Sequence, residues 1–214
     1  FGVSKGAFNR QGTKLYIPND GLDTVSVIDY SSNTTIGSIV LPAGYMPSIS
    51  MSPNGSIYVP VDNTIYVIDP DTDTVVRSFT VSCIDPSSLS YISFPRGRDY
   101  YYVPCSQDGL IYKLRVSDDS VISVLDVGAL TQQISIVDEG LDPAKLYVSG
   151  IYNTVTGDKI MVVDSSNGSL ISTITLTDQA IAPIITPDGQ YIYAATQGAG
   201  FGTFNIDVIS AVSD

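Results

Sequence analysis

The chain has 214 residues, of which 43% are hydrophobic and 15% charged, so it can form the core of one large domain or two small ones. Its formal net charge is −12 and it has no histidine. An acidic chain repels phosphate backbones and anionic lipid headgroups, so we expect no nucleic acid partner and no membrane-surface binding. No stretch approaches the roughly 20 apolar residues that span a bilayer, so we also expect no membrane insertion. No signal peptide is visible. Because the chain begins inside a repeat, this observation is compatible with a leader that was removed before residue 1.

Short apolar runs containing a tyrosine recur along the chain and define a repeat. The runs are Leu15–Pro18, Ile57–Pro60, Tyr101–Pro104, Leu146–Ser149 and Ile192–Ala195. Their aligned tyrosines, at positions 16, 58, 102, 147 and 193, are 42, 44, 45 and 46 residues apart. A glycine in a predicted turn precedes each run: Gly12, Gly55, Gly97, Gly140 and Gly189. Repeats of this length indicate a solenoid, propeller or array rather than an irregular globular fold.

Two further apolar runs follow in each repeat. The first alternates and ends in aspartate, as in Val25–Asp29, Ile65–Asp69 and Lys159–Asp164; the third and fifth repeats depart, with Arg115 and Ser210 at that place. After a polar turn comes a β-branched run: Thr34–Leu41, Thr74–Val81, Ser120–Val127 and Ser169–Leu176. Together with a strand before the glycine turn, each repeat has four short strands, which is the pattern of a propeller blade.

The pattern therefore predicts an all-β protein, a β-propeller of about five four-stranded antiparallel blades in a single domain, residues 1–214. The repeats run approximately over residues 1–47, 48–86, 87–132, 133–180 and 181–214. No segment has a 3.6-residue apolar period, so we expect almost no helix.

The repeat units resemble those of the YVTN family of propeller proteins. The family unit combines a Pro-Asp-Gly turn, a Tyr-Val-Thr-Asn run, a Val-Ser-Val-Ile-Asp run and a Thr-rich turn. The first, second and fourth repeats match it best, and the resemblance extends over the whole chain. It implies a propeller fold. It says less about activity, because this propeller occurs in surface-layer proteins, lyases, lactonases and oxidoreductase domains.

The last predicted blade is incomplete. It has strands at 181–186, 190–196 and 203–210, and no fourth strand follows. Its predicted assembly edge consists of Thr203, Phe204, Asn205, Ile206, Asp207, Val208, Ile209 and Ser210. An open edge is a template for pairing with another chain. Three explanations stay open: a longer chain supplies the missing strand, a neighbouring subunit donates it, or the edge is tolerated as it is.

The residue types argue against catalysis. Without histidine, the usual general base and a common metal ligand are missing, and the strands predicted to line the centre carry no paired carboxylates. We therefore predict no catalytic and no cofactor-binding residues. Alternating oxygens of Asp69, Asp71 and Asp73 in a short turn could chelate calcium. The Asp- and Thr-rich turn of this repeat type explains the same residues without a metal, and that interpretation is favoured.

Two other groups of residues carry predictions. Cys83 and Cys105 lie in connections that a propeller places on one face, so they can meet as a disulfide if the compartment is oxidising; two separate small core residues are the alternative. The sequons at Asn33, Asn54 and Asn167 fall in turns on the opposite face and are candidate glycosylation sites. Their number is what chance gives in a chain this rich in Ser and Thr, so the placement alone is informative.

These observations lead to one functional hypothesis with two alternatives. The hypothesis is a non-enzymatic extracellular or cell-surface structural protein, part of a filament, lattice or adhesive assembly. It would contact copies of itself or another envelope protein through propeller faces and the open blade edge, with glycans as further partners. One alternative is a propeller enzyme of lactonase or lyase type that uses the central channel. The other is a binding module of a larger secreted protein.

Overall fold

A computed structural model describes residues 5–83, 89, 91–105, 107–128, 133–139, 142–151, 159–176, 179–186, 188–197 and 204–211. These residues form five antiparallel sheets, each built from consecutive strands. Within this part of the chain the helical structure is a single 3-10 turn, η1 (Asp20–Leu22), so the protein is all-β. None of it forms a helix with the length and apolarity that crossing a bilayer requires.

The first and second sheets have four strands each, in sequential order. The strands of the first sheet are β1 (Ala7–Phe8), β2 (Lys14–Asn19), β3 (Thr24–Asp29) and β4 (Thr34–Val40). Those of the second are β5 (Ser50–Met51), β6 (Ile57–Val61), β7 (Thr64–Asp69) and β8 (Thr74–Thr80). Strands with one polar or Gly-containing turn between them pair with their sequence neighbours, as expected for a meander.

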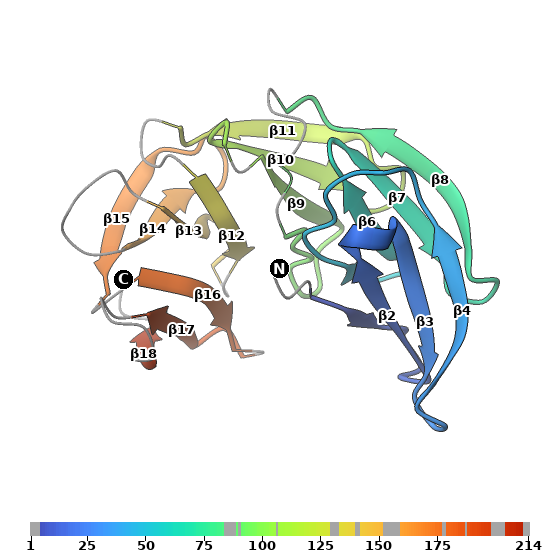
Figure 1. The fold of residues 1–214 in the computed structure, drawn as a ribbon. Coiled ribbons are helices and arrows are strands. Elements are labelled where there is room, and N and C mark those ends of the chain that lie inside the picture. Colours follow the sequence, from blue (N-terminus) through green and yellow to red (C-terminus); the bar gives the residue numbers. More distant parts are fainter. Residues whose placement is uncertain are drawn as a thin grey trace.

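The remaining sheets have three, four and three strands. The third sheet consists of β9 (Tyr100–Cys105), β10 (Leu110–Arg115) and β11 (Val121–Asp126). The fourth consists of β12 (Gln133–Glu139), β13 (Lys145–Ile151), β14 (Lys159–Asp164) and β15 (Leu170–Thr175). The fifth consists of β16 (Gln179–Ile185), β17 (Tyr191–Gln197) and β18 (Phe204–Ser210). Figure 1 shows the five sheets following one another around an arc, with β4, β8, β11 and β15 on the outside and β12 and β16 on the inside.

The register confirms that the repeats are structurally equivalent. In each of the first four sheets the pairing of the last two strands shifts at one place. The shifts lie at Val27/Ile28, Val67/Ile68, Lys113/Leu114 and Val162/Val163. All four sites are at the same distance from the end of their strand, so residues at matching register positions can be compared between sheets.

The third sheet differs from the predicted four-stranded blade. The segment expected to form its inner strand contacts β9 through two isolated bridges, Leu89 with Cys105 and Ser93 with Tyr102. Pro95 follows shortly and lacks the N–H that a ladder needs. Phe94 instead stacks on Tyr101, with the ring centroids 4.8 Å apart. Side-chain packing thus holds this segment where a regular ladder does not form.

Neighbouring sheets pack face to face, and each sheet turns its tyrosine-bearing face toward the next sheet in the chain. Tyr16 of the first sheet points at the second, and Ile57 of the second points back at the first; both are fully buried in one cluster. At the next junction Tyr58 of the second sheet points at the third, whose Val103 points back. The tyrosine face of each sheet therefore meets the opposite face of the following sheet. Burial of each such Val, Ile or Tyr stabilises the fold by about 1.5–3 kcal/mol, and these junctions form the core.

Candidate functional site

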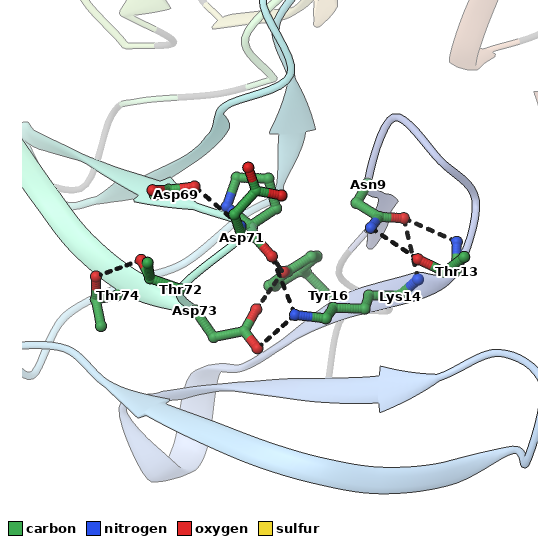
Figure 2. A network of polar contacts seen from close by, with 10 residues as sticks. Asn9, Thr13, Lys14, Tyr16, Asp69, Asp71, Thr72, Asp73 and Thr74 are labelled. Carbon is green, nitrogen blue, oxygen red and sulfur yellow. Dashed lines mark hydrogen bonds and ion pairs between the residues drawn. The ribbon is translucent and has the colours of Figure 1, made fainter.

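A polar contact bridges the first and second sheets beside their apolar core. The Tyr16 hydroxyl donates a hydrogen bond to Asp73 Oδ1 at 2.5 Å, and Lys14 Nζ lies 2.7 Å from Asp73 Oδ2. Figure 2 shows both side chains reaching from the first sheet to Asp73, which lies in the turn before β8. Tyr16 also donates to the Pro70 carbonyl oxygen at 3.4 Å. One aspartate thus binds two side chains of the preceding sheet.

The junction of the second and third sheets repeats this arrangement with more partners. The Tyr58 hydroxyl lies 2.8 Å from Asp119 Oδ1, and the Tyr101 hydroxyl donates to the same oxygen at 2.9 Å. Arg77 Nε lies 2.7 Å from Asp119 Oδ2, and Arg77 Nη2 donates to the Tyr58 oxygen at 2.8 Å. The Asp119 side chain is 6% exposed. A carboxylate this deep is stable because three donors surround it.

The aspartates occupy one special backbone position. Asp73 and Asp119 have φ of 55° and 57°, and the equivalent residue of the first sheet, Asn33, has φ of 54°. Asn and Asp tolerate this left-handed conformation better than other side chains. The fourth sheet has Gly168 there, with φ of 77°. A Cβ on Gly168 would lie 3.3 Å from Cβ of Leu125 in the third sheet, so this turn also touches the preceding sheet.

A related contact joins the fourth and fifth sheets. The Tyr147 hydroxyl donates to the Ala211 carbonyl oxygen at 3.2 Å. Ala211 follows the end of β18 as Pro70 follows the end of β7, so this bond matches that from Tyr16 to Pro70. The repeated tyrosine therefore contacts the last turn of the following sheet at the junctions formed by Tyr16, Tyr58 and Tyr147.

The environment keeps these phenols neutral. Burial, the hydrogen bond to Asp73 and the charge of Asp73 raise the pKa of Tyr16 far above its ordinary value. Burial first and then the Asp119 carboxylate do the same to the pKa of Tyr58 and of Tyr101. For Arg77, burial lowers the pKa, but the hydrogen bond to Asp119 together with the charge interactions with Tyr58, Asp119 and Tyr101 outweighs it, and the net shift is upward. The junctions therefore hold their tyrosines as neutral phenols, which donate to the carboxylates.

The structure uses the three predicted calcium ligands separately. Asp69 Oδ1 accepts a hydrogen bond from the backbone N–H of Asp71, while Asp73 turns toward Tyr16 and Lys14 (Figure 2). No local pattern in the sequence indicates this contact, because the partners are 57 and 59 residues from Asp73. The structure does not bring the three carboxylates together.

The cysteines lie side by side and form a disulfide, with their Cα atoms 5.6 Å apart. Cys83 follows the second sheet and Cys105 ends β9. The cysteines and Asp108 are the one group of three potential ligands that the described residues bring within 4.8 Å, and the disulfide engages both sulfurs. A disulfide is consistent with an extracellular location, because cytosolic thiols are kept reduced.

The three sequon asparagines lie in exposed turns. Asn54 accepts a hydrogen bond from the Ser56 N–H at 3.3 Å, and Asn167 accepts one from the Ser169 N–H at 2.8 Å. The turns containing Asn33, Asn54 and Asn167 lie at the same end of their sheets, by the order and direction of the strands. Glycosylation at these three asparagines stays a prediction.

The predicted assembly edge lies on β18, the outermost strand described in the fifth sheet; Thr203 lies outside the described residues, as does the side chain of Phe204. Ile206 and Val208 are 68% and 57% exposed. The register places Val208 opposite Tyr193 and Ile206 opposite Ala195. With Ile184 opposite Tyr193 on β16, these side chains form one exposed apolar surface, which we call the fifth-sheet face. It consists of Ile184, Tyr191, Tyr193, Ile206 and Val208.

Comparisons with known proteins bear on the fold alone. No family model matches the chain, and no curated protein matches it either. Among solved structures, the hydrazine synthase of Kuenenia stuttgartiensis is similar, with a TM-score of 0.78 and 16% sequence identity. The likeness covers 98% of this chain and 63% of the other, so this chain spans less than two thirds of that protein's chain. In all, 1372 chains of solved structures match, so the fold by itself does not select a function.

Proposed function

We propose that this chain is a β-propeller of about five blades that serves as a non-enzymatic structural protein at the cell surface or outside the cell. Each sheet described above is one blade, and the fifth blade has three strands. The supporting observations are the repeated register, the constant sense in which the sheets pack, and the arc of sheets in Figure 1. The disulfide fits the proposed location.

The observation that carries the structural role is the fifth blade. It presents β18 at an edge and a surface of large apolar side chains up to 68% exposed. Apolar patches of this kind mark sites of protein contact. The partner is a copy of this chain or another envelope protein, and glycans at Asn33, Asn54 and Asn167 would leave the fifth blade free.

An enzymatic role has less support from the site. Asp73 and Asp119 lie between sheets and bind Lys, Arg and Tyr of the fold itself. A carboxylate held in this way is unsuited to general acid–base work, because its charge is already matched. We therefore propose that the protein acts through its surface.

Sedimentation velocity over a concentration series tests self-association. We expect larger species as the concentration of the chain rises, and a sedimentation coefficient that stays at the monomer value would refute the proposal.

Pairing of copies along the edge strand β18 is tested separately. Proline is introduced in turn at Asp207 and Val208. Successive N–H groups of a strand alternate in direction, so one proline removes an outward donor and the other interrupts pairing with β17. The variant that keeps the circular dichroism of the parent is the one that lacks the outward donor, and we expect it to remain monomeric. Association of that folded variant at the parent's strength would exclude pairing at the edge.

A further inference from the structure

The outer strand of each of the first four sheets contains one residue that the pairing with its neighbour leaves out. The residues before and after it pair with two consecutive residues of the neighbouring strand. Two residues of the outer strand thus face one residue of its partner, which is the arrangement of a β-bulge. The residues left out are Ile36 in β4, Val76 in β8, Ile122 in β11 and Ile171 in β15.

The four bulges share their position and their residue type. Each is followed by four regularly paired residues that end the strand, as in Arg77–Thr80 of β8. Each bulged residue is an isoleucine or a valine, and its side chain is between 45% and 52% exposed. The preceding pairing in each of these sheets, β2–β3, β6–β7, β9–β10 and β13–β14, runs without a shift. The bulge therefore belongs to the outer strand, and four sheets of different sequence keep it.

Apart from the bulge, the four outer strands have the properties of edges that pair with other chains. Each is the last strand of its sheet in the described part of the chain, and Figure 1 shows all four on the outside of the arc. Their residues are mostly exposed and rich in Val, Ile, Thr and Ser, and they include neither lysine nor proline. Their charged residues are Arg77, which binds Asp119 of the third sheet, and Asp126. Lysine, proline and bulges are the usual protection of an edge, and these strands have the bulge.

A bulge opposes pairing through the geometry of the backbone. In a regular edge strand the N–H and carbonyl groups that point away from the sheet alternate evenly, and an incoming strand needs that alternation along its length. The extra residue breaks the alternation, bends the strand and increases its twist. The regular run of four residues that remains in each outer strand is shorter than a typical strand of about five or six. An incoming chain therefore finds no continuous template.

We propose that the four bulges protect the outer edges of the sheets, so that copies of this chain do not pair through β4, β8, β11 or β15. The inference goes beyond the proposed function, because it holds equally for a protein that assembles through another surface and for one that stays monomeric. It assigns the bulged residue a role in the backbone rather than in its side chain. Removing the residue and changing its side chain should therefore have different effects.

Deletion of Ile122 tests the protection of β11. The residues on either side of Ile122 pair with consecutive residues of β10, Lys113 and Leu114. After the deletion these two pairs follow each other in a regular ladder, and their side chains keep their faces. We expect the variant to associate at a concentration at least about tenfold below that of the parent, as sedimentation velocity measures. The deletion removes an exposed apolar side chain, so hydrophobicity alone would change association in the opposite direction.

Hydrogen exchange and two further variants locate the effect. When the deletion variant associates, the amides of β11 should become protected, as hydrogen exchange with mass spectrometry measures. Ile122→Thr keeps the bulged residue while it shortens the apolar side chain, and it should associate as the parent does. Val124→Lys, added to the deletion, places a charge on an exposed residue of the straightened edge. Because a charge protects an edge as a bulge does, it should restore the behaviour of the parent.

A folded deletion variant that associates only as the parent does, or that associates without protection of β11, would overturn the inference. Circular dichroism and thermal melting establish that each variant is folded. Where deletion of Ile122 prevents folding, deletion of Ile36, Val76 or Ile171 repeats the test in another sheet.

Lysines on the outer edges of the otherwise unchanged chain give a test without any deletion. The triple variant Val76→Lys, Val124→Lys and Ile171→Lys places charges on exposed residues of three outer strands. If the bulges already protect these edges, the variant should associate no more weakly than the parent. Weaker association would show that the outer edges pair in the parent and that the inference is wrong; general repulsion cannot cause it, because the lysines reduce the net charge of −12. A parent that stays monomeric refutes the proposed function but agrees with this inference.

Discussion

At the scale of single residues, the junctions depend on an aspartate that two sheets share. Asp119 accepts from Tyr58 and Tyr101 and pairs with Arg77, although its side chain is almost fully buried. The tyrosine hydroxyls and the guanidinium would lack this acceptor if the carboxylate were removed. A buried donor left without a partner destabilises more than the bond itself contributed.

We therefore expect Asp119→Ala to lower the free energy of unfolding by about 2–3 kcal/mol, a value kept moderate because Arg77 is partly exposed. Urea denaturation followed by circular dichroism measures the change. The matched control is Asp71→Ala, an exposed aspartate of the corresponding turn in the second sheet, which should change stability by less than about 0.5 kcal/mol. Equal effects of the two substitutions would show that the contact shared between the sheets adds no measurable free energy of unfolding.

The buried phenols also make stability depend on pH. The pKa values of Tyr16, Tyr58 and Tyr101 are raised above the ordinary value of 10.0 in the folded protein. The unfolded chain releases these protons near pH 10 while the folded chain keeps them, so their contribution is complete below pH 10 and is lost as the pH rises above it.

We expect the melting temperature to fall steadily from pH 10 toward about pH 12, with tyrosinate absorbance appearing together with unfolding. Tyr101→Phe removes one of the titrating groups and should reduce the slope of the melting temperature against pH. A melting temperature that stays constant over this range would contradict the assignment of these phenols to the buried junctions.

At the scale of elements, the third sheet is the least regular. Its inner segment joins β9 through two isolated bridges, and the disulfide between Cys83 and Cys105 attaches the connection from the second sheet to the end of β9. The cross-link spans a sequence separation of 22 residues. Where the ladder is sparse, a covalent link limits the freedom of the same segment in the unfolded chain.

Replacing both cysteines with alanine should lower the free energy of unfolding by about 3 kcal/mol, the chain-entropy value for a loop of this length. In a chain of this size that corresponds to a fall of about 6–12 °C in the melting temperature. Calorimetry of the oxidised parent, the reduced parent and the double variant measures it. The reduced parent should behave like the double variant, and a reduced parent as stable as the oxidised one would contradict the role given to the disulfide.

At the scale of the whole molecule, charge opposes assembly while the apolar faces favour it. Each copy carries a formal net charge of −12, so copies repel one another at low ionic strength. The fifth-sheet face, the surface proposed for contact, consists of exposed Ile, Val and Tyr side chains. Salt therefore screens the repulsion without weakening the contact.

We expect the association of the parent chain to strengthen as salt is raised from about 20 to about 300 mM, where the Debye length becomes shorter than the separation of most surface charges. Light scattering at a fixed protein concentration measures this. Weaker association in salt would mean that charge pairs hold the copies together, in conflict with the apolar surfaces described here.

The strands and their order follow from local sequence patterns. The period of the tyrosine runs and the alternation of apolar residues are local patterns, and strands form wherever such a pattern places apolar side chains on one face. That is why the three strands of the fifth sheet, and the last three of the first, second and fourth, lie close to their predicted ranges. The third sheet deviated because Pro95 and the packing of Phe94 outweigh the local pattern there.

Contacts between repeats, in contrast, depend on how the sheets pack in three dimensions. Nothing local links Asp73 to Tyr16 or Asp119 to Tyr58, because each pair is about one repeat apart and is brought together by the packing of successive sheets. Within the acidic turn of Asp69, Asp71 and Asp73, it is Asp73 that makes a contact between sheets. In the same way, the composition of β18 showed an apolar strand, but only the register revealed that Ile206 and Val208 stand at positions buried in the other sheets. Burial depends on which surfaces come together in space, and that is a property of the fold rather than of any segment.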